Sequence, residues 1–170
     1  MASLVEELVN VLDAEKKIYT TLVGYEERKK DVLIAADVTA LEEITTKEQL
    51  AGDDLIAYSN KQIQILKDIA TVLGRTDGKM TVTRLISLLD TQPKVQEQLT
   101  EARDSLLTAA NQMKTLSDQN AILIRQAVEL NEFDMTLFKS LRQAPETANY
   151  DKSAYNTGSL LGGGGFDATS

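Results

Sequence analysis

The sequence contains no cysteine, no histidine and no tryptophan. Without cysteine no disulfide can form, and without cysteine and histidine the usual zinc sites are excluded. Catalysis by a histidine base or a cysteine nucleophile is excluded for the same reason. The sequence also offers no phosphate-binding loop and no activated nucleophile. We therefore predict no catalytic residues, no metal, no cofactor and no enzymatic activity.

Excess basic charge and long apolar runs are also missing. The formal net charge is −8 at pH 7, whereas nucleic acids and anionic membranes select basic surfaces. No uncharged stretch approaches the ~20 residues that cross a bilayer. Glu6 and Glu7 lie close to the N-terminus, which is unlike a secretory signal. We expect a soluble intracellular protein that binds no nucleic acid and does not insert into the membrane.

Proline is scarce, with only two in the chain, and this leaves room for long helices. From Val95 to Leu141 an apolar residue recurs every three or four positions, which places these residues in one row, or seam, along a helix. Only Asn120 and Asp134 in this row are polar. This heptad pattern predicts one continuous helix of roughly 70 Å. Pro93 suits its first turn, and we expect the helix to end before Pro145. A helix of this length needs partner helices, because propensity alone does not hold it.

Two further segments, residues 4–36 and 41–72, repeat the three-and-four spacing. Asp37 and Thr39 lie between them and can turn the chain and cap the second helix. The segments therefore predict an antiparallel helical hairpin that turns near residue 38.

Each of these two seams is interrupted twice by polar residues, at Glu15 and Lys29 in the first and at Glu48 and Gln62 in the second. Facing residues of an antiparallel hairpin have numbers with a constant sum. Residues 29 and 48 add up to 77, and so do residues 15 and 62. We therefore predict one ionic layer and one hydrogen-bonded layer that fix the register of the hairpin.

Other charged and polar residues are expected to be structural or solvated. Asn120 on the long seam is interpreted as a further register device rather than a ligand. The basic clusters at 16–17 and 28–30, next to Glu26 and Glu27, are expected to form solvated faces.

The rest of the chain connects or follows the long helices. Gly74–Gly78 predicts a break, and 81–90 a short connector helix. Residues 146–170 have no periodicity and contain four consecutive glycines, which is typical of a flexible, disordered tail. The predicted fold is all-α: an antiparallel hairpin of long helices and a longer third helix form a three-helix, coiled-coil-like bundle over 1–145.

The C-terminal part of the long helix is expected to extend beyond the hairpin, because the hairpin helices are shorter. It carries a row of large apolar residues, which we term the apolar stripe: Leu130, Phe133, Leu137, Phe138 and Leu141. An uncovered stripe with two phenylalanines favours a binding face for a partner helix. The alternatives are that the connector or a second copy of the chain covers it.

The order of these features resembles the FlgN-type flagellar export chaperones over about residues 4–158. The resemblance rests on Leu4, Leu8, Glu15, Tyr19 and Leu22, on the segments 41–48 and 116–123, on Asn131, and on a tyrosine in the tail. The most specific combination is Leu116, Asn120 and Leu123 on the long helix together with the tyrosine that follows it.

The resemblance implies a cytoplasmic chaperone without enzymatic activity that serves the proteins of the hook–filament junction. Such chaperones hold the C-terminal helix of an unassembled junction protein on their own C-terminal helix and deliver it to the type III export gate at the membrane. A tail tyrosine of the family is implicated in docking to the gate. Tyr150 has the matching place, and Tyr155 is followed by the glycine of the family pattern at 158.

A second hypothesis requires no client. In it, the chain is a structural coiled-coil scaffold that self-associates as a weak homo-oligomer through the C-terminal part of the long helix.

Overall fold

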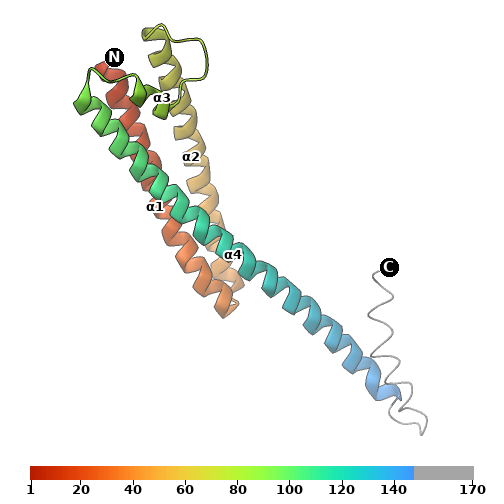
Figure 1. The fold of residues 1–170 in the computed structure, drawn as a ribbon. Coiled ribbons are helices and arrows are strands. Elements are labelled where there is room, and N and C mark those ends of the chain that lie inside the picture. Colours follow the sequence, from red (N-terminus) through yellow and green to blue (C-terminus); the bar gives the residue numbers. More distant parts are fainter. Residues whose placement is uncertain (148–170) are drawn as a thin grey trace. The chain divides into compact units, whose positions relative to one another are not determined.

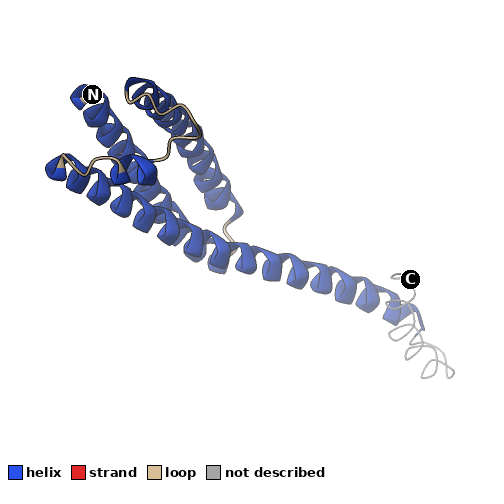
Figure 2. Ribbon diagram, turned by 45° about the horizontal axis from the view of Figure 1, so that its top comes forward, coloured by secondary structure: helices blue, strands red, loops and turns tan. Residues whose placement is uncertain are grey.

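The part of the chain that the structure describes, residues 1–147, consists of helices and their connections. In this computed structural model four helices follow one another, as Figure 1 shows. They are α1 (Ala2–Ala35), α2 (Val38–Val72), α3 (Val82–Ser87) and α4 (Pro93–Thr147). Figure 2 shows helices and loops only, with no strand among these residues. The predicted all-α fold, with a long hairpin, a short connector helix and a longer last helix, is confirmed.

The α1–α2 hairpin turns over two residues. Ala36 adopts the left-handed conformation, with φ 53° and ψ 35°, and its N–H donates to the Leu33 carbonyl at 3.2 Å. The Asp37 carboxylate then accepts a hydrogen bond from the Ala40 N–H at 3.1 Å and so caps α2. Of the two predicted capping residues, Asp37 therefore has the role, and Thr39 lies inside the first turn of α2. This tight connection places α1 and α2 side by side.

The left-handed Ala36 gives a stability prediction. A side chain with a Cβ is disfavoured in this conformation, and glycine is not. Ala36→Gly should therefore raise the free energy of unfolding by about 0.5–1 kcal/mol, measured by urea denaturation. The matched control is Ala35→Gly, one residue earlier in helical conformation, which should lower stability by about the same amount. If both substitutions destabilise, the hairpin turn differs from the one described.

The connector between α2 and α4 follows the predicted break closely. Gly74 adopts a φ of 62° after the last residue of α2, and the Arg75 N–H donates back to the Ala70 carbonyl at 2.9 Å. The Thr81 hydroxyl accepts from the Arg84 N–H at 3.1 Å and caps α3. α3 ends at Ser87 and is shorter than the predicted 81–90, because the chain then turns through short-range bonds toward the start of α4.

The core lies where the N-terminal part of α1, the C-terminal part of α2, the connector and the start of α4 meet. Its fully buried large side chains include Leu8, Ile69, Leu85 and Leu99, which come from four different helices. Burial of each such side chain stabilises the fold by roughly 1.5–3 kcal/mol. The short helix α3 is therefore a part of the core and not only a connection.

The chain divides into two compact units. The first comprises Met1–Leu123, and the second begins at Ile124. The boundary falls inside α4, so this helix contributes residues to both units. The bundle predicted over 1–145 ended instead where the composition of the sequence changes. No helix within residues 1–147 is both long and apolar enough to span a bilayer. The predicted extension of α4 beyond the hairpin stays a prediction.

The end of α4 differs from the expectation. The helix was predicted to stop before Pro145, but it continues through Pro145 to Thr147. A proline removes one backbone hydrogen bond and disfavours helical conformation in the residue before it. Near the end of a helix only the last turn is weakened, so the helix can continue for two more residues. Residues 146 and 147, predicted to open the tail, are thus helical. Residues 148–170, with Tyr150 and Tyr155, lie outside the described part of the chain.

Candidate functional site

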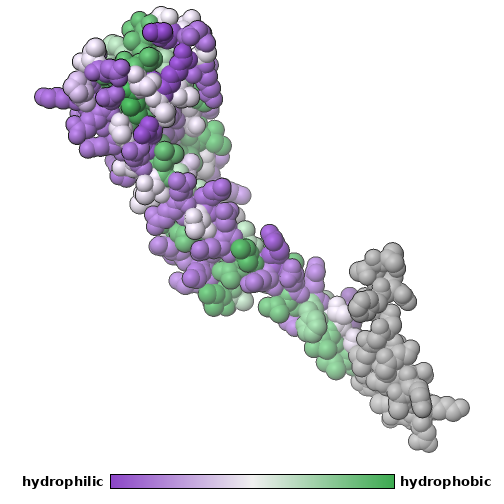
Figure 3. Space-filling model, viewed as in Figure 1, coloured by the Kyte–Doolittle hydropathy of each residue, from purple (hydrophilic) through white to green (hydrophobic). Residues whose placement is uncertain are grey.

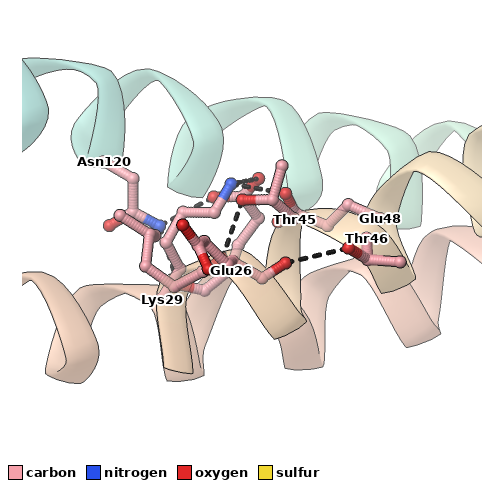
Figure 4. Close-up of polar contacts among 8 residues, drawn as sticks. Glu26, Lys29, Thr45, Thr46, Glu48 and Asn120 are labelled. Carbon is pink, nitrogen blue, oxygen red and sulfur yellow. Dashed lines mark hydrogen bonds and ion pairs between the residues drawn. The ribbon is translucent and has the colours of Figure 1, made fainter. Parts of the chain in front are cut away.

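Four polar side chains from three helices meet at one level of the first unit, as Figure 4 shows. The Lys29 ammonium of α1 lies 2.5 Å from the Glu48 carboxylate of α2 and 3.5 Å from the Glu26 carboxylate of α1. The Asn120 side-chain amide of α4 donates to the Glu26 carboxylate and to the Glu26 backbone carbonyl, both at 2.7 Å. We call these four residues the polar network. It connects α4 to the hairpin.

The polar network is largely shielded from water. Asn120 is 2% and Glu26 6% exposed. Burial raises the pKa of Glu48, although the Lys29 ammonium opposes this shift. One Glu48 carboxylate oxygen, Oε1, is buried without a hydrogen-bond partner. Groups in such surroundings are costly unless matched, so the network favours one register of the three helices over the others.

Of the two predicted pairs, the structure brings Lys29 and Glu48 together but does not join Glu15 to Gln62. Glu15 is buried at 4% exposure, and its Oε2 has no hydrogen-bond partner. Gln62 is half-buried, and no hydrogen bond joins it to Glu15 within residues 1–147. Burial raises the pKa of Glu15 to about 7. Burial without the expected amide partner thus favours the protonated form of this carboxyl group.

Glu26 was missed by the sequence analysis, which placed it on a solvated face next to the basic cluster. A second row on α1 shows why this was wrong. Val5, Leu12 and Glu26 are all buried and fall on a seven-residue spacing, with half-buried Tyr19 on the same row. In a three-helix bundle each helix faces two neighbours, so its buried face is wider than one seam. This seven-residue spacing is the feature of the sequence that could have identified Glu26 as buried.

The apolar stripe of α4 is exposed in the second unit. Its side chains retain 46–63% of their surface. The exposed residues are Leu130, Phe133, Leu137, Phe138 and Leu141. Their spacing of three and four residues places them on one side of the helix. Figure 3 shows hydrophobic side chains gathered along this C-terminal part of α4 on the face in view.

A polar face limits the stripe on the opposite side of the helix. It consists of residues that follow the same three-and-four spacing in a different phase: Arg125, Glu129, Glu132, Thr136 and Lys139. The Arg142 guanidinium lies 5.9 Å from the centre of the Phe138 ring, in cation–π geometry. Residues 124–142 of α4 are therefore amphipathic, with exposed apolar side chains on one side, a pattern that suits a partner helix lying lengthwise along them.

Further exposed apolar residues adjoin the stripe and were not in the predicted set. Ile124 and Met135 are 40% and 52% exposed, and Val128 is also 52% exposed. They lie toward the edge of the stripe that faces away from Phe133. The sequence contained this signal, since positions 124, 128 and 135 continue the stripe around the helix beyond Phe138. They widen the surface available to a partner.

The first unit has a hollow that we considered as a competing site. It measures ≈ 710 Å³ and lies between α2 and residues 76–82, with Leu66, Met80 and Val82 in its wall. Its lining contains lysine, threonine and glutamine side chains but no carboxylate. Within residues 1–147 no group of three acidic side chains is arranged to hold a metal ion. The apolar stripe is therefore the better candidate for the functional site, and its chemistry suits the binding of an apolar helix face.

Comparison with known proteins indicates a family. The family model described as FlgN protein matches residues 1–158. The alanine–tRNA ligase of Pseudoalteromonas translucida (strain TAC 125) is 32% identical over 98 residues, which are 58% of this chain and 9% of the ligase. The chain thus spans less than a tenth of that relative, and no enzymatic property follows from the likeness. No solved structure matches the chain.

Proposed function

Because the chain belongs to the FlgN family of flagellar export chaperones, we propose that it binds the C-terminal helix of the hook–filament junction proteins on its apolar stripe. In this proposal the bound helix cannot assemble prematurely in the cytoplasm. The chaperone then delivers the junction protein to the type III export gate.

The exposure of the stripe carries this proposal. Large apolar side chains grouped on one helix face are seldom left in water without a partner, and Leu130, Phe133 and Phe138 each keep more than half of their surface exposed. A protein that assembles through helical ends needs those ends masked until export. A substitute helix with a matching apolar face provides that mask.

The size of the stripe is sufficient for specific binding. A fully buried large apolar side chain contributes on the order of 1.5–3 kcal/mol. The five side chains keep 46–63% of their surface exposed, so covering them would contribute roughly half of that amount each, and the apolar side chains of the bound helix would contribute as well. The affinity is what remains after the costs of association and of ordering the bound helix. The three neighbouring apolar residues Ile124, Val128 and Met135 add to the surface.

Delivery to the gate is proposed through the tail. The resemblance to the family assigns gate docking to a tail tyrosine, and Tyr150 and Tyr155 are the two candidates. Binding of the client and docking to the gate would then use separate segments of the chain. A variant with both tyrosines changed to alanine should retain client binding and lose export.

The client site is tested with synthetic peptides of the C-terminal helices of the junction proteins encoded in the same genome. Phe133→Ala and Leu130→Ala in the full-length chain should each weaken peptide binding about tenfold or more, measured by titration calorimetry. The matched control is Leu50→Ala on α2. Leu50 is 62% exposed and Leu130 is 63% exposed, so the same truncation is made at equal exposure. The control should bind the peptide as the unchanged protein does.

Thermal unfolding of the same variants separates binding from folding. Truncation of a residue that supports no core should shift stability by less than about 0.5 kcal/mol. Loss of about 3–5 kcal/mol for Phe133→Ala, with peptide binding intact, would instead place Phe133 in a structural core and reject the client site. Light scattering of the full chain completes the test, because a dimer that Phe133→Ala dissociates would support self-association through the stripe.

A further inference from the structure

One charged residue interrupts the apolar stripe. Asp134 lies four residues after Leu130, and three and four residues before Leu137 and Phe138. On a helix these spacings make all three apolar residues its neighbours on the same side. Asp134 is exposed in the described structure and forms no ion pair within residues 1–142. A helix that covers the stripe must also cover this carboxylate.

Two polar seam residues of the first unit are matched by a facing helix, whereas a third, Glu15, is buried with one carboxylate oxygen unpartnered. Asn120 lies on the same seam as Asp134, fourteen residues earlier, and is matched by the Glu26 carboxylate of α1. Lys29 on the first seam is matched by the Glu48 carboxylate of α2. In both cases the complementary group comes from the facing helix. Asp134 has the corresponding place on the apolar stripe, and no ion pair matches it within residues 1–142.

The α4 helix itself does not provide a cation for Asp134. Lys139 is five residues away and belongs to the polar face, and Arg142 lies over the ring of Phe138. In a second copy the cation nearest the stripe is Arg142, whose guanidinium lies over the ring of Phe138. Self-association through the stripe would place Asp134 against an apolar residue or against another carboxylate, and both are unfavourable.

We infer that the stripe selects a partner helix with a single lysine or arginine among its apolar contact residues, placed to face Asp134. This inference rests on the proposed function and defines the class of helix that the site accepts. Apolar contacts would supply most of the affinity, and the ion pair would select the register and reject helices with an apolar or acidic residue at the facing position. Asp134 is a specificity-determining residue in this scheme.

The test measures the sign of the effect of Asp134. Asp134→Leu extends the apolar surface, so it should tighten binding if the carboxylate is buried without a partner. If a cation of the peptide faces Asp134, the same substitution should weaken binding of the junction-protein peptide tenfold or more. The matched control is Glu132→Leu on the polar face, which removes the same charge and adds the same side chain two residues away. It should leave the affinity within about twofold.

A second measurement identifies the facing residue. Each lysine and arginine of the bound peptide is changed to methionine in turn, and each peptide is titrated against the unchanged protein and against Asp134→Leu. One position should lose tenfold or more with the unchanged protein and little with Asp134→Leu. Equal losses with both proteins, or tighter binding by Asp134→Leu, would overturn the inference. Failure of the proposed function looks different, because then Phe133→Ala would not weaken the peptide complex at all.

Discussion

Lys29→Met should lower the free energy of unfolding by about 2–4 kcal/mol at pH 7.5, measured by urea denaturation. The substitution leaves the Glu26 and Glu48 carboxylates near one another without the ammonium that separates their charges. Removing one member of a buried pair typically costs about 3–5 kcal/mol. The effect is smaller here, because the Lys29 and Glu48 side chains retain 13% and 16% of their surface. The loss should shrink as pH falls, because burial raises the pKa of Glu48 and its protonation removes the uncompensated charge.

The double variant decides between a register device and a simple loss of packing. Lys29→Met combined with Glu48→Leu removes both charges, so it should be more stable than Lys29→Met alone. Lys30→Met is the control, because the neighbouring Lys30 is exposed and should change stability by less than about 0.5 kcal/mol. A double variant less stable than the single one would mean that the ionic layer is not what aligns the hairpin.

The hairpin could be predicted from the sequence because its information is local and periodic. The heptad spacing specifies helices, Asp37 marks the turn, and the constant residue sum relates Lys29 to Glu48 through their residue numbers alone. The structure places those two side chains 2.5 Å apart. Asp37 caps α2 through the Ala40 N–H.

The long helix α4 was harder to place, because one row of apolar residues does not specify which two helices lie beside it. Glu26 lies beside the first seam, and its buried carboxylate is matched by the Asn120 amide of α4 and the Lys29 ammonium of α1. Glu15 illustrates the same limit. Its residue number matches Gln62, yet no hydrogen bond joins the two within residues 1–147. Polar pairing depends on side-chain reach and rotamer, which residue spacing does not contain.

The five residues of the apolar stripe were predicted from the sequence, but the full width of the exposed apolar surface was not. Spacing alone places Leu130, Phe133 and Leu137 on one side of a helix. The prediction considered only the central row of the stripe, so Ile124, Val128 and Met135 at its edge were missed. The residues that would decide gate docking, Tyr150 and Tyr155, lie outside the described residues.

Stability should depend on pH through Glu15. The pKa of its carboxyl group is raised by burial from about 4.5 to about 7, so the folded state holds this proton more tightly than the unfolded state does. The stabilising contribution of the protonated group is fully present below about pH 4.5 and is lost as pH rises through about 7. Glu15→Leu should therefore gain stability relative to the unchanged protein as pH rises from 5 to 8, by about 1–3 kcal/mol.

The difference between the two proteins, measured by urea denaturation at each pH, isolates Glu15 from the other titrating groups. Glu43→Leu is the matched control, since Glu43 is exposed on α2, and its difference from the unchanged protein should stay flat over this range. Tyr19 provides an independent readout. Burial and the charge of Glu15 both raise the pKa of its phenol. Glu15→Leu should therefore lower the pKa of Tyr19 in an ultraviolet titration. A pH-independent difference in stability, together with an unchanged Tyr19, would mean that water reaches the Glu15 carboxylate and that this layer of the bundle is not closed.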